Sequence, residues 1–174
     1  YMPPCGGGME ISMILIAHES LNHGIGRENS LMFRLPKDMK FFRETTTGAT
    51  VIMGRKTLES FPGKKPLPNR TNIVISRNPE LKIDGAIVCA DEKAAAEAAR
   101  RAGGEVYVIG GAAIYELMLE FCDTALITKV MEEVDADAFL HDFDSDPDWE
   151  LCESSGDIED NGHIIRFCKY RRKQ

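Results

Sequence analysis

Six short apolar runs, rich in β-branched residues, constrain the fold of this chain more than any other feature. They lie at residues 11–17, 49–54, 71–76, 85–90, 105–110 and 124–130. Near-continuous apolar runs of this length are typical of strands that are covered on both faces. Helical patterns separate them, at residues 36–46, 91–104 and 112–121, and a shorter helix is expected near residues 54–57. Strands that alternate with helices predict a largely parallel sheet between two layers of helices.

The C-terminal part follows another pattern. The segments "DWELCESS" and "HIIRFCKYRR" flank "GDIEDNG", in which Asn161-Gly162 is a strong turn signal. We therefore expect an antiparallel hairpin at one edge of the sheet. The sequence predicts one α/β domain over residues 11–174, with about eight strands and about four helices. Residues 1–10, "YMPPCGGGME", are rich in Pro and Gly, and we interpret them as a disordered extension or a remnant of cloning.

Composition and charge disfavour several classes of protein. The longest apolar run, residues 11–17, is too short to span a membrane, and residues 1–10 lack a signal-peptide pattern. Five scattered cysteines without a C-x-x-C pair, and four histidines without ligand spacing, predict reduced thiols in a cytoplasmic protein and no metal site. A net charge of −7 argues against a nucleic-acid or membrane-surface role. No oligomer signal is present, so we expect a monomer.

Two strand-to-helix junctions have features of a phosphate site. "VIMGRKT" runs from a strand through Gly54 into Arg55 and Lys56, and "VYVIGGAAIY" runs through Gly110-Gly111 into a helix. In a parallel sheet both junctions lie at the carboxyl ends of their strands, on one edge. Helix N-termini there offer unpaired N–H groups to phosphate. A diphosphate at one junction and a separate phosphate beside the basic residues would indicate NADP rather than NAD.

Each junction alone also fits an ordinary turn or a helix cap. The dinucleotide fingerprint of Rossmann enzymes is absent, because "GIGREN" has Asn29 in place of the third glycine and does not follow directly from a strand. A Rossmann enzyme is therefore disfavoured.

One acid lies on an apolar stretch at the start of a predicted helix. In "MFRLPKDMKFF", Pro36 marks the first helical position, so Asp38 lies in the first turn, where the helix dipole favours a carboxylate. That position alone is a sufficient structural explanation. However, Asp38 shares a face with Phe42, beside an apolar stripe that also includes Leu35 and Met39. A carboxylate at the margin of such a stripe needs hydrogen-bond donors, which a ligand with paired N–H groups would supply.

At this point the residues match a known family. From about residue 11 to its end, the chain resembles bacterial dihydrofolate reductase. The matching blocks occur in order: "GIGRENSLMFRLPKDMKFF", "VIMGRKTLES", "PLPNRTNIVIS", "VIGGAAIYE", "ITKV" followed by "DAD", and "DWE". The resemblance implies a three-layer fold with a mixed, mostly parallel sheet. It also implies NADPH-dependent reduction of 7,8-dihydrofolate to tetrahydrofolate, in support of one-carbon metabolism, and binding of antifolate inhibitors.

The resemblance also implies roles for individual residues. Asp38 would hold N3–H and the 2-amino group of the pterin ring, and Thr128 would join this network. The residues that would contact the substrate are Ile16, Ala17, Asp38, Met39, Phe42, Phe61, Leu67, Arg70, Ile109, Tyr115 and Thr128. Arg70 would bind the α-carboxylate, for which its planar fork is suited. The residues that would contact NADPH are Ala17, His18, Ile25, Gly26, Asn29, Ser30, Gly54, Arg55, Lys56, Thr57, Ser76, Arg77, Ile109, Gly110, Gly111, Ala112, Ala113 and Tyr115.

Residues 20–35 would form a loop that closes over the nicotinamide, and two catalytic positions in it depart from the family pattern. Phe33 replaces a tryptophan that holds an ordered water, and Leu31 replaces a methionine. His18 stands where the family has a small residue. Further departures are Leu58, Phe61 and Ala113. None of them removes the acid or the phosphate contacts.

Two alternatives remain open. A pterin or pyrimidine reductase of the same fold, such as those of the riboflavin pathway, would keep the cofactor junctions but does not need an acid such as Asp38. A non-catalytic nucleotide-binding module needs neither Asp38 nor Arg70. The blocks "LPKDMKFF" and "LPNR" favour dihydrofolate reductase over both.

Overall fold

The computed structural model describes residues 12–28 and 30–174, so the predictions for residues 1–10 and for Asn29 lie outside the described residues. The strands are β1 (Met13–Glu19), β2 (Gly24–Gly26), β3 (Thr50–Gly54), β4 (Thr71–Ile75), β5 (Ala86–Cys89), β6 (Val106–Gly110), β7 (Cys122–Val130), β8 (Ala138–Phe139), β9 (Trp149–Ser154), β10 (Ile158–Asp160) and β11 (His163–Arg172). The helices are α1 (Pro36–Thr46), α2 (Arg55–Glu59), α3 (Glu92–Ala102) and α4 (Ala112–Met118), with 3-10 turns at Pro62–Lys64 and Leu119–Phe121.

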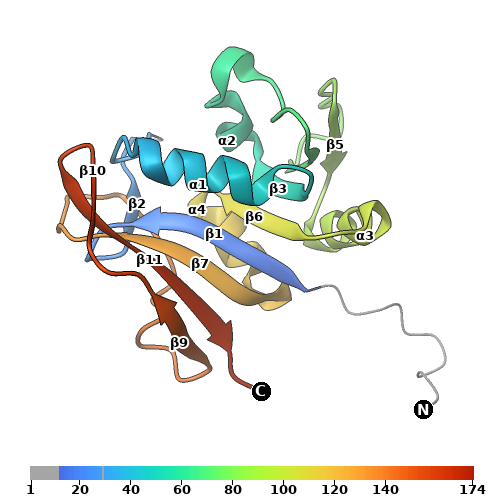
Figure 1. The fold of residues 1–174 in the computed structure, drawn as a ribbon. Helices are drawn as coiled ribbons and strands as arrows, with labels where there is room; N and C mark the ends of the chain where they lie inside the picture. Colours follow the sequence, from blue (N-terminus) through green and yellow to red (C-terminus); the bar gives the residue numbers. More distant parts are fainter. Residues whose placement is uncertain (1–11, 29) are drawn as a thin grey trace.

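The main sheet has the strand order β10-β11-β7-β1-β6-β3-β4-β5, and β9 also pairs with β11 (Figure 1). The strands from β7 to β5 are parallel, whereas β11 is antiparallel to β7. This arrangement confirms the predicted mixed, mostly parallel sheet. Within the described residues the sheet has nine strands rather than about eight. A separate two-stranded sheet pairs β2 with β8.

Alternate residues along the strands form two apolar layers. Val51 and Met53 pack on the side that includes Phe42 of α1 and Leu58 of α2. The intervening Ile52 packs on the opposite side. That side includes Ala95, Ala96 and Ala99 of α3 and Tyr115 and Met118 of α4. A period of two along buried parallel strands therefore produces the predicted three layers.

Helix α1 begins at Pro36, as predicted, because proline needs no N–H partner in the first helical turn. One prediction about this helix is wrong. Met39 is 60% exposed and does not belong to a core stripe with Leu35 and Phe42. The reason is that Leu35 is the N-cap residue, with non-helical backbone angles (φ −127°, ψ 88°), so helical spacing counted from it does not mark one face. Helix α3 begins with the predicted Asp91 cap, whose Oδ1 accepts a hydrogen bond from the Ala94 N–H at 2.8 Å.

The C-terminal hairpin turns at Asn161-Gly162, both with positive φ, as the sequence predicts. The strand on its N-terminal side differs from the prediction. It is the short β10, paired through Asp160 with His163, whereas "DWELCESS" forms β9 and pairs farther along β11. The residues between β9 and β10 allow both strands to pair with β11.

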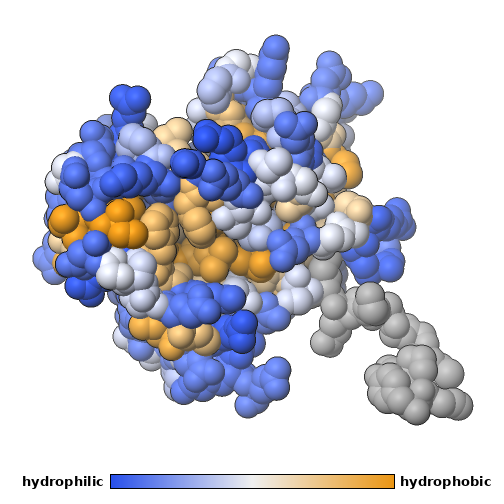
Figure 2. Space-filling view, viewed as in Figure 1, coloured by the Kyte–Doolittle hydropathy of each residue, from blue (hydrophilic) through white to orange (hydrophobic). Residues whose placement is uncertain are grey.

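Helix α1 leaves part of the sheet uncovered. Figure 2 shows apolar side chains in the strip between α1 and the strands beneath it. A cavity of about 280 Å³ is lined there by Phe41, Thr45, Leu126, Ile127, Thr128, Glu153, Phe167, Cys168 and Lys169. Asp38 does not line this cavity, although Thr128, which donates a hydrogen bond to Asp38, does.

None of the helices in the described residues is long and apolar enough to cross a membrane. The cysteines of the described part, Cys89, Cys122, Cys152 and Cys168, are free thiols, and no group of possible metal ligands is found in that part of the chain.

Candidate active site

Asp38 is held between three elements of the fold. Its Oδ1 accepts a hydrogen bond from the Thr128 hydroxyl of β7 at 2.7 Å, and its Oδ2 lies 3.2 Å from Nδ1 of His18 on β1. The side chain of Asp38 is only 14% exposed. Since β1 and β7 pair with His18 opposite Thr128, both residues present their side chains to the same acid. The expected contact between Thr128 and Asp38 is present.

His18, which the resemblance places among the cofactor contacts, lies against Asp38 in the structure. Because a carboxylate can only accept, His18 donates from Nδ1 to Asp38. Its Nε2 is buried and has no hydrogen-bond partner among the described residues. His18 therefore lies beside the acid. No local sequence signal predicts this contact, because it depends on the register between β1 and β7.

Tyr115 binds the middle of β1 from the other side of the sheet. Its hydroxyl donates to the Ile16 carbonyl at 2.7 Å. Burial, together with the nearby negative charge of Asp38, raises the pKa of Tyr115, so its phenol stays protonated and keeps donating. Gly110 leaves room for this ring: it has φ of +114°, and a Cβ there would lie 3.2 Å from Tyr115 ring atoms. A residue with a side chain at position 110 would be strained.

The two glycine junctions lie at one edge of the sheet, as predicted, and they are neighbours there. Strands β3 and β6 pair in parallel, with Met53 opposite Gly110. A Cβ on Gly54 would lie 3.0 Å from Ile114 of α4, and a Cβ on Gly111 would lie 3.9 Å from the Thr57 hydroxyl of α2. The absence of a side chain at Gly54 therefore allows α4 to approach closely, whereas a Cβ on Gly111 would make only an ordinary contact.

The basic residues of the predicted phosphate site lie along the same edge. Arg55 and Lys56 form the first turn of α2, and both are exposed. Arg55 Nε lies 3.5 Å from Glu59 on the same helix. Ser76 and Arg77 follow β4, whose last residue, Ile75, pairs with Gly54. Strand order thus brings two separate basic segments to one place on the surface.

Arg70 lies near α1 and is partly buried. Its Nη2 donates to the Thr47 hydroxyl at 3.3 Å, and its guanidinium lies 5.9 Å from the centre of the Phe42 ring. Burial, and then repulsion by Arg43, lowers the pKa of Arg70. Its Nε is buried and unpaired among the described residues. A ligand carboxylate would satisfy this group and reduce the repulsion between the two arginines.

The remaining predicted residues fall into two groups. Several line the apolar layer on the α1 side of the sheet: Ile16, Phe42, Phe61, Leu67 and Ile109. Ala17 lies between Ile16 and His18 on β1, and Ala112 and Ala113 begin α4. Ile25 and Gly26 are in β2, and Ser30 forms a bridge with Arg27. Two residues point to solvent instead: Leu31 is 73% exposed and Met39 is 60% exposed.

Phe33 is buried beside the site. Its ring packs edge-on against the rings of His18 and His163, with distances between ring centroids of 6.3 Å and 5.1 Å. As the sequence indicates, the side chain at this position has no N–H group to donate.

Comparisons with known proteins agree with this geometry. The family model described as dihydrofolate reductase matches residues 11–172. The dihydrofolate reductase of Bacillus subtilis is 34% identical over 87% of this chain and 89% of its own length. That of Haemophilus influenzae is 36% identical over 91% of this chain and 98% of its own length. A solved dihydrofolate reductase of Enterococcus faecalis, complexed with NADP(H) and RAB-propyl, superposes with a TM-score of 0.84 at 28% identity, covering 94% of this chain and 97% of that one. This chain belongs to the dihydrofolate reductase family.

Proposed function

We propose that this protein reduces 7,8-dihydrofolate to 5,6,7,8-tetrahydrofolate with NADPH. The family, the curated relatives and the NADP(H)-bound structural relative support this reaction. The observation that carries it is the carboxylate of Asp38, largely shielded from solvent and held by the Thr128 hydroxyl. An ordinary surface acid at a helix start would need neither feature.

Asp38 is suited to bind a heterocycle with two adjacent N–H donors. A carboxylate offers about four acceptor positions. Thr128 and His18 each use one, on different oxygens. One position remains on each oxygen, which matches N3–H and the 2-amino group of a pterin. The negative charge would also favour the cationic form of the ring, which develops as N5 is protonated.

The cofactor site is assigned to the paired junctions. The glycines at 54, 110 and 111 would let the backbone approach the diphosphate, and Arg55, Lys56 and Arg77 would surround the 2′-phosphate. Bound NADPH supplies the hydride for C6 of the substrate. The protein's own contribution is to hold both rings in contact and to exclude water. Asp38 binds the end of the pterin ring that is remote from N5, so it cannot protonate N5 directly. We therefore propose that a water molecule donates this proton.

Arg70 is assigned to the α-carboxylate of the substrate. It lies near the C-terminal end of α1, whereas Asp38 lies at the start of that helix. Its buried Nε has no partner among the described residues, and a carboxylate would satisfy it. We further propose that the folded part of the chain acts as one domain, as a monomer, in the cytoplasm, without nucleic-acid or membrane partners. Antifolates with paired N–H donors would compete at Asp38.

The direct test is an absorbance assay of NADPH oxidation. We expect the purified protein to oxidise NADPH only when dihydrofolate is present, and to do so much more slowly with NADH. Riboflavin-pathway pyrimidines serve as the control substrates and should give no turnover. Absence of dihydrofolate-dependent oxidation in protein that binds NADPH would contradict the proposed function.

A further inference from the structure

We propose that Asp160 is a positioning residue for Asp38, and this inference rests on the proposed function. Asp160 ends β10 and is 1% exposed. Its Oδ1 accepts a hydrogen bond from the Lys37 N–H, and its Oδ2 accepts one from the N–H of Asp38 itself, both at 3.1 Å. A buried carboxylate from a distant strand therefore binds the main chain of the residue that holds the substrate.

The start of α1 needs such a partner. The residue at the N-cap, Leu35, has no side-chain oxygen, and Pro36 has no N–H. The first free amides of the helix are those of Lys37 and Asp38, the positions that an N-cap side chain normally satisfies. Asp160 takes over this role from 122 residues away in the sequence. Its negative charge also complements the positive end of the helix dipole.

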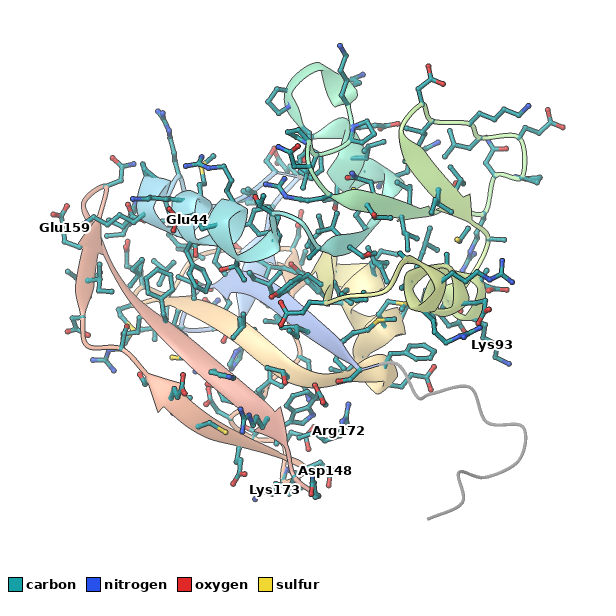
Figure 3. The ribbon with its side chains drawn as sticks, turned by 45° about the vertical axis from the view of Figure 1, so that its right-hand side comes forward. Glu44, Lys93, Asp148, Glu159, Arg172 and Lys173 are labelled. Atoms are coloured by element: carbon teal, nitrogen blue, oxygen red, sulfur yellow. The ribbon has the colours of Figure 1, made fainter. Side chains whose placement is uncertain are left out.

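Neighbouring residues of the hairpin strengthen the same contact. The Asn161 side chain donates to the Arg34 carbonyl at 2.9 Å, and the Lys37 ammonium donates to the Glu159 carbonyl. Figure 3 shows Glu159 on the hairpin beside α1, with Glu44 farther along the helix. Among these hairpin residues, Asp160 is buried, whereas Glu159 and Asn161 are exposed.

Asp38 is thereby held at two points of one rigid sheet. Asp160 fixes its main chain from β10, and Thr128 fixes its carboxylate from β7. Both strands pair with β11, with His163 opposite Asp160 and Phe167 opposite Thr128. The hairpin therefore sets the distance between the helix start and the hydroxyl that orients the acid. Loss of the main-chain anchor would let the carboxylate shift, and a shift of about 1 Å can cost up to about 100-fold in rate.

The test compares two helix caps. We expect Asp160→Ala to raise KM for dihydrofolate and Kd for trimethoprim, a 2,4-diaminopyrimidine with paired N–H donors, by about tenfold, while Kd for NADPH changes less than about twofold. Asp91→Ala is the matched control, because it removes a carboxylate cap from α3, which packs on the opposite side of the sheet from α1. It should lower the melting temperature but leave KM for dihydrofolate and Kd for trimethoprim unchanged. Asp160→Asn keeps one acceptor oxygen and should raise the same two constants by an intermediate amount. This variant also provides the test if Asp160→Ala does not fold.

A double-mutant cycle separates positioning from a general loss of structure. In an Asp38→Asn background, Asp160→Ala should no longer weaken trimethoprim binding, because the group that it positions is changed. An unchanged KM in a folded Asp160→Ala variant, or equal losses in NADPH and substrate binding, would overturn the inference. Failure of the parent protein to reduce dihydrofolate would instead overturn the proposed function.

Discussion

Replacement of Asp38 by asparagine is expected to lower kcat/KM for dihydrofolate by about 10²–10³-fold at neutral pH, with little effect on folding. The amide keeps the size of the side chain, but its NH2 group cannot accept a hydrogen bond. It would therefore face a donor, either a ligand N–H or the Thr128 hydroxyl, which in the parent protein donates to Oδ1 at 2.7 Å. The variant also loses the negative charge that favours a cationic ring. Steady-state kinetics with saturating NADPH measure the effect.

Glu44→Gln is the matched control on the same helix. Glu44 is exposed and lies 3.9 Å from Lys40, so the same chemical change there should leave kcat/KM unchanged. Kd for NADPH should be unaffected in both variants. An Asp38→Asn enzyme that turns over dihydrofolate like the parent would remove Asp38 from its assigned role.

The second large effect concerns the choice of cofactor. The double variant Arg55→Gln with Arg77→Gln should lower the ratio of kcat/KM for NADPH to that for NADH by about 100-fold. Each lost charge-assisted contact is worth about 1.5 kcal/mol at an exposed site, and about 1.4 kcal/mol is a factor of ten. Arg55 is 48% exposed, so solvent keeps the value at the lower end of the range. The activity with NADH should remain near that of the parent.

Lys93→Gln with Lys173→Gln is the control for this experiment. Both lysines are exposed and lie away from the paired junctions, on α3 and at the C-terminus (Figure 3). This pair removes the same charge from the protein and should not change the cofactor ratio. An equal loss of kcat/KM with NADPH and NADH in the arginine variant would show that these residues do not recognise the 2′-phosphate.

Local sequence signals predicted much of this fold. Pro36 marks the start of α1, and Asp91 marks the start of α3, because both residues act within one helical turn. The apolar runs predicted the strands, since burial on both faces leaves a continuous apolar pattern. The parallel arrangement predicted that both glycine junctions lie at one edge of the sheet, and the pairing of β3 with β6 places them next to each other at that edge.

Contacts that depend on tertiary structure were not predictable in this way. The exposure of Met39 was missed because Leu35, the residue before the helix, has non-helical backbone angles and so breaks the assumed spacing. The contact between His18 and Asp38 depends on the register of β1 with β7. Asp160 is far from α1 in the sequence, and nothing around it indicates a helix cap. Side chains that meet through strand pairing leave no periodic pattern in the chain.

A crystal structure of the protein with NADP⁺ and folate, an unreactive pair, would test the role of Asp38 most directly. The two carboxylate oxygens should lie about 2.7–3.2 Å from N3 and the 2-amino nitrogen of the pterin, with Thr128 still bound to Oδ1. A pterin ring that binds in the cleft without touching this carboxylate would contradict the account.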